Sequence, residues 1–155
     1  MAVDAARGRP SIAVVSDHLV LRAAESRELA AVIAFWTTAA ENASRPADTP
    51  AAIAALHLRD ANALIVAVEG DRIVGTIIVG WDGWRCHVYR LAVHPDRRRA
   101  GIGRALIAAA EDRARALGGT RMDAMVLDGN DQAHRIWAAR GYRRQDDWSR
   151  WVKPL

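Results

Sequence analysis

Residues 93–103 read Val93-His94-Pro95-Asp96-Arg97-Arg98-Arg99-Ala100-Gly101-Ile102-Gly103. A run rich in apolar residues precedes them and an amphipathic pattern follows, so they are expected to join the end of a strand to the start of a helix. A helix start exposes unpaired backbone N–H groups and the positive end of the helix dipole, and two glycines let an anion approach that backbone closely. The stretch therefore predicts a cradle for a diphosphate, with arginine side chains at its rim.

The segments around this stretch follow strand and helix patterns in turn. Downstream, the pattern predicts a helix over 102–117, a strand over 121–127, a helix over 131–140 and one or two last strands within 142–152. Upstream, it predicts a strand over 18–22, helices over 25–40 and 50–58, and a meander of strands over 64–68, 73–79 and 85–93. This order predicts a mixed α/β sheet, mostly antiparallel, with four helices.

The chain has 155 residues, a length that favours one domain. We expect this domain over 18–155, preceded by a loose N-terminal extension over 1–17. The sequence shows neither an apolar run long enough to span a membrane nor a signal peptide, so neither a membrane nor a secreted role is expected. The single cysteine, Cys86, fits a reducing cytoplasm and a small buried side chain, and it predicts no thiolate metal site.

The charge favours anionic partners. The net charge is +4, and of the 22 basic residues only Lys153 is a lysine, so nearly all the positive charge is guanidinium, which pairs well with phosphate. A nucleic-acid module would present a basic stripe interleaved with aromatic residues. Here the arginines concentrate in the 93–103 stretch and along a helix that also carries Glu111 and Asp112. No nucleic-acid partner is therefore expected.

Two nucleotide-binding motifs are alternatives for the same glycines. Gly101-x-Gly103 is part of a dinucleotide fingerprint, and Asp123 has a suitable spacing for its ribose acid. However, Leu106 occupies the third glycine position, and Gly101 follows the strand end too late for that tight turn. A P-loop lacks its Gly-Lys-Ser/Thr. A solvated arginine-rich loop that caps a helix without a ligand is the other alternative.

Two spaced motifs resemble the GNAT N-acetyltransferases. Arg98-x-x-Gly101-x-Gly103, entered from Leu91-Ala92-Val93-His94-Pro95, is similar to that family's acyl-CoA motif. Asn130-x-x-Ala133-x-x-Ile136-Trp137-x-x-x-Gly141-Tyr142 is similar to its second signature, and the match runs from about His18 to the C-terminus. The 73–85 hairpin, with Arg45-Pro46 upstream, also resembles a branch of small bacterial acetyltransferases whose substrates are poorly defined.

The resemblance implies how acetyl-CoA, the acyl donor, would bind without a metal. The strands at 85–93 and 121–127 would splay apart, and the pantetheine would lie between them against the backbone of Leu91 and Val93. The pyrophosphate would lie on the amides of 98–104, and Asn130 would hold the pantetheine arm. The residues expected at the donor are Leu91, Ala92, Val93, Arg98, Arg99, Ala100, Gly101, Ile102, Gly103, Arg104, Asn130 and Trp137.

The resemblance also implies an acetyl transfer to a primary amine of a small molecule or a peptide, by direct attack in a ternary complex. An ammonium is mostly protonated at pH 7, so a base must remove its proton. His87 stands where the family often carries a glutamate, and Tyr89 shares its strand face; Met125 replaces a second family glutamate. His87 and Tyr89 are thus the candidate catalytic residues, although a strand histidine can also be structural.

Trp137 occupies the position of the family's tyrosine acid. An indole N–H donates a hydrogen bond but does not release its proton at neutral pH, so Trp137 is better interpreted as an aromatic anchor. The departure leaves open a second hypothesis, an acyl-CoA-binding regulatory module that has lost turnover.

The acceptor groove of the family forms near the 43–48 loop and the 81–85 hairpin tip. Aromatic faces and the carboxylate of Asp82 could receive a cationic amine, although the same composition also fits a homodimer edge. The candidate acceptor residues are Trp36, Arg45, Trp81, Asp82, Trp84 and Arg85.

Overall fold

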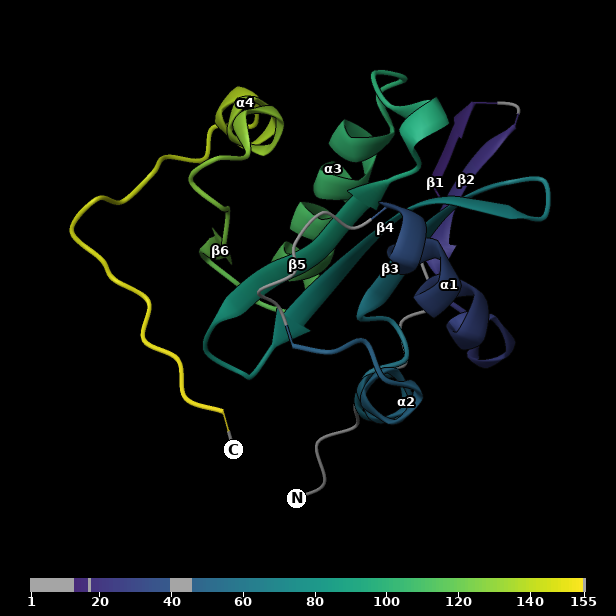
Figure 1. Cartoon of the computed structure of the whole chain (residues 1–155), viewed down its shortest axis with the longest axis horizontal. Helices are drawn as coiled ribbons and strands as arrows, with labels where there is room; N and C mark the ends of the chain where they lie inside the picture. Colours follow the sequence, from purple (N-terminus) through teal and green to yellow (C-terminus); the bar gives the residue numbers. More distant parts are fainter. Residues whose placement is uncertain (1–12, 17, 40–45, 155) are drawn as a thin grey trace. The chain divides into compact units, whose positions relative to one another are not determined.

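The computed structural model describes residues 13–16, 18–39 and 46–154 (Figure 1). The chain forms two compact units, Met1–Met125 and Val126–Leu155. Within the described residues, no helix is long and apolar enough to cross a membrane. The prediction of one domain over 18–155 stays a prediction.

A six-stranded sheet forms the first unit, with its strands ordered β1-β2-β3-β4-β5-β6. Neighbouring strands are antiparallel except β5 and β6, which are parallel, so the predicted mixed and mostly antiparallel sheet is confirmed. The strands are β1 (Ala13–Ser16), β2 (Leu19–Ala23), β3 (Leu64–Glu69), β4 (Arg72–Trp81), β5 (Cys86–Val93) and β6 (Met122–Ala124).

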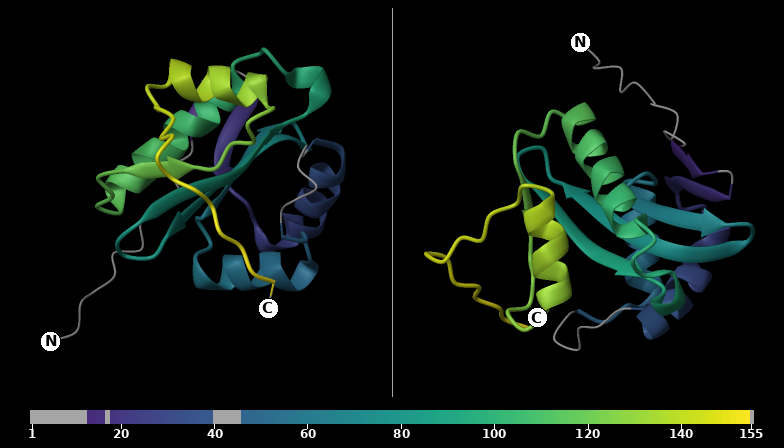
Figure 2. Two further views of the ribbon diagram at one scale, coloured as in Figure 1. Left: turned by 60° about the vertical axis from the view of Figure 1, so that its left-hand side comes forward. Right: turned by 90° about the horizontal axis from the view of Figure 1, so that it is seen from above.

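Helices cover both faces of this sheet. Figure 2 shows α3 (Ile102–Ala116) on one face, and α1 (Leu29–Ala39) and α2 (Pro50–Arg59) on the other. Thr49 caps α2, since its hydroxyl accepts a hydrogen bond from the Ala52 amide at 3.1 Å, and Pro50 follows at the first helical position, as predicted. A short 3-10 turn, η2 (Pro95–Arg97), lies between β5 and α3. The second unit contains α4 (Asp131–Ala139).

Separate apolar clusters fill the space on each side of the sheet. On the α1–α2 side, buried residues of both helices meet even-numbered residues of β3 and β4. On the other side, α3 approaches so closely that a Cβ at Gly75 would lie 2.9 Å from the side chains of Ile102 and Leu106. Gly75 therefore permits α3 to lie directly on β4. The cluster on the α1–α2 side contains Ala24, Val32, Phe35, Trp36, Ala39, Ile53, Leu64, Val66, Val68, Ile78 and Ala92.

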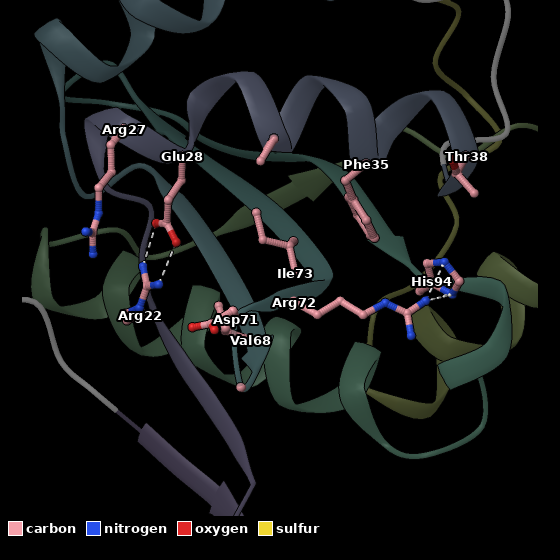
Figure 3. Close-up of a pocket in the computed structure, with 12 residues that line it drawn as sticks. Arg22, Arg27, Glu28, Phe35, Thr38, Val68, Asp71, Arg72, Ile73 and His94 are labelled. Atoms are coloured by element: carbon pink, nitrogen blue, oxygen red, sulfur yellow. Dashed lines mark hydrogen bonds and ion pairs between the residues drawn. The ribbon is translucent and has the colours of Figure 1, made fainter.

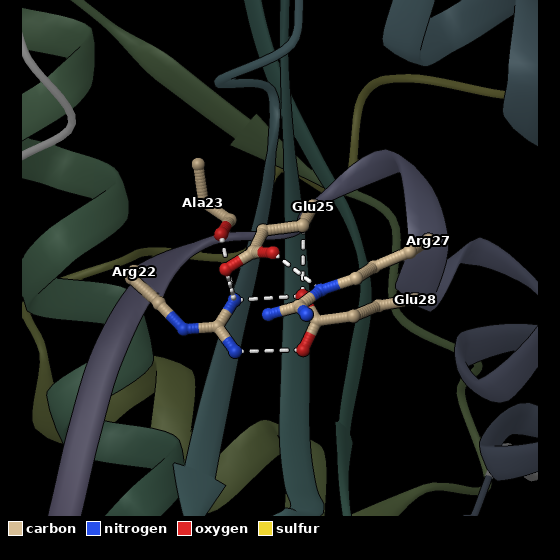
Figure 4. Close-up of polar contacts among 5 residues, drawn as sticks. All are labelled: Arg22, Ala23, Glu25, Arg27 and Glu28. Carbon is tan, nitrogen blue, oxygen red and sulfur yellow. Dashed lines mark hydrogen bonds and ion pairs between the residues drawn. The ribbon is translucent and has the colours of Figure 1, made fainter.

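A group of charged residues stabilises the start of α1, within and next to the 3-10 turn η1 (Ser26–Glu28) (Figure 4). Arg22 donates two hydrogen bonds to the Glu28 carboxylate, at 2.7 and 2.6 Å. The same carboxylate accepts the amide of Glu25 at 2.8 Å, and Arg27 pairs with Glu25. The hydrogen bond from Arg22 is the main reason that the pKa of Glu28 lies below its usual range.

Three predicted elements differ from the structure. Residues 13–16, assigned to the loose extension, form β1 and pair antiparallel with β2, because the free edge of β2 offers backbone N–H and C=O groups to a neighbouring strand. The predicted strand at 121–127 is shortened to β6. The described part of the chain contains no strand within 142–152, where every residue except Tyr142 is exposed and none of the described strands pairs with the segment. Residues 1–12 lie outside the described residues.

Candidate functional site

The edge of β5 toward β6 is paired over only part of its length. The parallel ladder joins Cys86, His87 and Val88 to Met122, Asp123 and Ala124. β6 ends at Ala124 while β5 continues to Val93, so within the described strands residues 89–93 have no ladder partner on this side. A free strand edge presents N–H and C=O groups that an extended chain containing amides can pair with.

A β-bulge lies on β5 just beyond the paired part. Tyr89 faces Ile78 and Ala92 faces Thr76, so β5 has one residue more than β4 between these two pairs. Arg90, one of the two β5 residues between these pairs, has a φ of 55°, in the left-handed region. The Thr76 hydroxyl donates a hydrogen bond to the Arg90 carbonyl at 2.8 Å, so this carbonyl is satisfied outside the regular ladder.

The start of α3 has the geometry of an anion cradle. Gly101 is its N-cap with a φ of 80°, and Arg99 also has a positive φ of 63°. The first hydrogen bond of the helix runs from the Ala105 amide to the Gly101 carbonyl, at 3.0 Å. Within the described residues, the amides of 99–104 have no hydrogen-bond partner, and a Cβ at Gly101 would meet nothing within 4 Å. Unpaired amides before open space fit a phosphate group.

The arginines of the cradle divide into two groups. Arg97 is ion-paired with Glu69, and the Nε of Arg98 donates to the Val93 carbonyl at 3.4 Å. Arg99 and Arg104 are exposed, and their side chains make no hydrogen bond or ion pair to any part of the chain that the structure describes. Arg99 and Arg104 are therefore the guanidinium groups best placed for a phosphorylated ligand.

His87 and Tyr89 lie on one exposed face of β5, as their spacing predicts. The His87 side chain is 46% exposed, and its Nδ1 lies 3.9 Å from Oδ2 of Asp123. The Tyr89 ring lies over Gly80, where a Cβ would be 3.2 Å from its Cε1, and burial raises the pKa of its phenol. Sequence reasoning considered Asp123 only as a ribose ligand; the parallel register that places it beside His87 was not visible in the sequence.

The candidate acceptor residues do not form one cluster. Trp81 faces Cys86 across the β4–β5 pair and its ring lies near Gly119 at the end of α3, on the side opposite to His87. Trp84 is 88% exposed at the hairpin tip. Arg85 is also exposed, and Arg45 lies outside the described residues.

Two other acceptor candidates have structural partners. The Asp82 carboxylate accepts the amides of Trp84 and Arg85 at 2.8 and 2.6 Å, and these bonds hold its pKa below the usual range. Trp36 is buried, and its indole N–H donates to the Thr76 hydroxyl at 2.9 Å. The structure thus shows Asp82 building the turn and Trp36 supporting the sheet from the α1 side.

In the second unit, Asn130 and Trp137 lie at the two ends of α4. Asn130 caps the helix, since its Oδ1 accepts the Ala133 amide at 3.0 Å. Trp137 is 8% exposed, and its ring meets Tyr142 edge-on with centroids 4.7 Å apart. These contacts fit the interpretation of Trp137 as an aromatic anchor.

A separate hollow of about 610 Å³ lies beside α1 and the β3–β4 turn (Figure 3). Phe35 and Ile73 contribute apolar surface, while Arg72 lies 2.8 Å from Nε2 of His94, and Arg22 pairs with Glu28. Several of its charged side chains are thus paired with one another, and none of the residues lining it was predicted as a site residue.

Among the described residues, no group of three or more His, Cys, Asp or Glu side chains could hold a metal ion.

Comparison with known proteins assigns the fold and the motifs to one family. Residues 19–142 match the model of the acetyltransferase (GNAT) family. The chain belongs to the GNAT family. Among curated relatives, an acetyltransferase of Sodalis glossinidius is 37% identical over 87 residues, which make up 56% of this GNAT chain and 61% of the relative. The chain thus matches about three-fifths of the length of that relative.

Solved structures share the fold of this GNAT chain. Ard1 from Thermoplasma volcanium has a TM-score of 0.70 and 22% identity, over 80% of this chain and 82% of that one. The putative acetyltransferase yncA from Salmonella typhimurium, solved with acetyl-CoA, has a TM-score of 0.67 and 24% identity, over 81% and 79%. At these identities the likeness shows the fold alone.

Proposed function

We propose that this GNAT chain is an N-acetyltransferase that transfers an acetyl group from acetyl-CoA to a primary amine of a small molecule or a peptide. One observation carries the proposal: the unpaired edge of β5 at 89–93 leads, through η2, to the unpartnered amides of 99–104. The first site suits an extended chain that contains amides, and the second suits a diphosphate. Acetyl-CoA carries its pantetheine and its pyrophosphate next to each other in this order.

The donor would contact mainly backbone groups. Its pantetheine amides would pair with the β5 edge around Leu91 and Val93, and its pyrophosphate would lie on the amides that begin α3. Arg99 and Arg104 would add charge at the rim. The N–H groups near Val93 could also polarise the thioester carbonyl.

Transfer would proceed by direct attack of the amine on the thioester carbon. The ammonium first loses one proton to Nε2 of His87, directly or through a water, so that the amine is neutral. The nitrogen–carbon bond then forms and the carbon–sulfur bond breaks, and the second proton that the nitrogen loses passes through water to the departing thiolate. Asp123, near Nδ1, would favour the tautomer with its proton on Nδ1, which leaves Nε2 free to accept. The thiolate needs no tyrosine acid to depart, because a thiol with a pKa of about 8.5 is a tolerable leaving group.

The decisive experiment measures donor binding and turnover separately. Acetyl-CoA is expected to raise the Tm by mass action, whereas NADH is expected to leave it unchanged. Release of free thiol is then followed with polyamines, amino acids, aminoglycosides and peptide N-termini as acceptors. No Tm shift with acetyl-CoA would contradict the proposal at its first step.

The second candidate, an acyl-CoA-binding module without turnover, rests on Trp137, which is buried against Tyr142 where relatives in the family carry the tyrosine acid. A working transferase predicts that Trp137→Phe keeps donor binding and most of kcat. A module without turnover predicts a Tm shift with acetyl-CoA but no thiol release with any amine. In that case Trp137→Tyr is expected to restore some thiol release. A large loss of kcat in Trp137→Phe with intact binding would instead show the indole N–H stabilising the departing sulfur.

A further inference from the structure

Arg90 forms a largely buried ion pair with Asp48. Its Nε lies 2.7 Å and its Nη2 2.5 Å from Oδ1 of Asp48, and Nη2 also donates to the Pro46 carbonyl at 3.0 Å. The two side chains are only 15% and 12% exposed. These bonds connect the middle of β5 to the residues that precede α2, more than 40 positions earlier in the sequence.

Two further residues hold the Arg90 guanidinium and backbone in place. The guanidinium carbon lies 5.5 Å from the centroid of the Trp36 ring, a cation–π distance. Thr76 joins the two, since its hydroxyl accepts from the Trp36 indole and donates to the Arg90 carbonyl. Trp36, Asp48, Thr76 and Arg90 are called the Arg90 clamp below. The clamp also maintains the left-handed φ of Arg90, which is uncommon for a residue with a side chain.

The clamp lies next to the proposed acceptor face. Tyr89 precedes Arg90 on β5, and its phenol interacts electrostatically with Arg90 and with Arg59, the last residue of α2. Asp48 directly precedes Thr49, the cap of α2, so holding Asp48 also fixes where α2 begins. The 46–49 segment, α2 and the exposed side of β5 with His87 and Tyr89 are therefore held in one arrangement.

Stability alone is a poor explanation for such a pair. Taking two charges out of water is costly, and a well-packed apolar pair of the same volume often stabilises a fold as well or better. A buried ion pair that joins two distant segments at a bulge instead favours a specific geometry.

We propose that Asp48 and Arg90 are positioning residues that hold the 46–49 segment and the start of α2 as one wall of the acceptor site, beside Tyr89. The inference rests on the proposed function. It adds which face of β5 the amine approaches and which residues fix the wall of the acceptor site on that face. The acceptor reaches the thioester from the face of β5 that lies toward α2. The donor is held by the edge of β5 toward β6 and by the start of α3.

The kinetic test uses Asp48→Asn, Arg90→Lys and a matched control. Asp60 accepts two hydrogen bonds from Arg113, at 2.7 and 2.6 Å, in an ion pair that joins the end of α2 to α3 and does not involve Arg90 or the 46–49 segment. Asp48→Asn and Arg90→Lys are expected to raise the acceptor KM about tenfold or more, while the affinity for acetyl-CoA stays within about twofold of the parent. Asp60→Asn is expected to leave the acceptor KM and the acetyl-CoA affinity within about twofold of the parent. Asp48→Glu, which keeps the charge, is expected to recover part of the loss. Equal acceptor KM values in Asp48→Asn and Asp60→Asn would overturn the inference.

Hydrogen exchange tests the clamp without any activity. The amides of residues 47–55 are expected to exchange at least about tenfold faster in Asp48→Asn than in the parent, and at the parental rate in Asp60→Asn. Unchanged exchange in Asp48→Asn would overturn the clamp whatever the kinetics. Faster exchange in a parent background that acetylates no amine would support the clamp while contradicting the proposed function, so the two failures are distinguishable.

Discussion

The cradle at the start of α3 and the exposed face of β5 follow each other in the chain but are assembled differently. The cradle uses contiguous backbone, the amides of 99–104 shaped by the left-handed Gly101. The face of β5 combines its own His87 with side chains from distant segments, among them Asp48 and Asp123. A backbone site leaves a local sequence motif, whereas a side-chain site depends on strand register. This difference explains why the sequence motif predicts a class of acyl donor, whereas no sequence motif predicts the class of acceptor.

The largest expected effect is on the cradle. Gly101→Glu places a carboxylate at the proposed phosphate site and a side chain at a φ of 80°, so acetyl-CoA binding is expected to weaken more than about 100-fold, measured by Tm shift or calorimetry. The matched control is Gly118→Glu, which meets a similar φ of 87° at the other end of α3 and is also surrounded by open space. Equal stabilisation of Gly101→Glu and the parent by acetyl-CoA would rule out the cradle.

The next effect tests the chemistry of the β5 face. His87→Ala is expected to lower kcat/KM about 100-fold with a productive amine, because the proton acceptor is lost, while donor binding is unchanged. Asp123→Asn is expected to lower it less, about five- to tenfold, since it removes only the orienting carboxylate. Tyr89→Phe is the control on the same face. If Tyr89→Phe is inactive and His87→Ala is not, the proton passes to the phenol instead.

A third prediction concerns the support of the β5 face. Thr76 is fully buried and links the Trp36 indole to the Arg90 carbonyl, so Thr76→Val leaves two polar groups without partners. The expected loss in the free energy of unfolding is about 2–4 kcal/mol, measured by urea titration. Thr76→Ser keeps the hydroxyl and is expected to lose about 1 kcal/mol. Equal losses in the two variants would show that the methyl group matters and the hydrogen bonds do not.

The smallest effect lies outside both regions, at the start of α1. The pKa of Glu28 is lowered from its ordinary value of 4.5, mainly by the hydrogen bond from Arg22, so its contribution is fully present above that value and is lost as the pH falls through the lowered one. Glu28→Gln is therefore expected to cost about 1 kcal/mol at pH 7 and almost nothing once the pH lies below both values. Unfolding titrations at several pH values measure the difference, with Glu25→Gln as the control. A loss independent of pH would contradict the role of the charge.

Most of the helices and strands could be predicted because their signals are local. The apolar period of 102–117, the Thr49-Pro50 start and the Asp82-Gly83 turn all appear in the structure within a few residues of their expected bounds. The errors concern segments whose structure depends on a partner. β1 forms against β2, and the expected strand within 142–152 is not formed. A short strand is stable only when a neighbouring strand pairs with it.

The sequence by itself determined the order of the elements from β2 to α4, the glycine-containing start of α3 and the resemblance to the GNAT family, because apolar period, turn residues and backbone-binding motifs are written in contiguous residues. Only the tertiary structure decided that Trp81 and His87 lie on opposite sides of the sheet, that Asp123 lies beside His87, and that Arg90 reaches Asp48. A shift of one residue in register moves every side chain of a strand to the other face, and the bulge at Arg90 makes such a shift. That register depends on how the strands pair across the sheet, which local sequence does not specify.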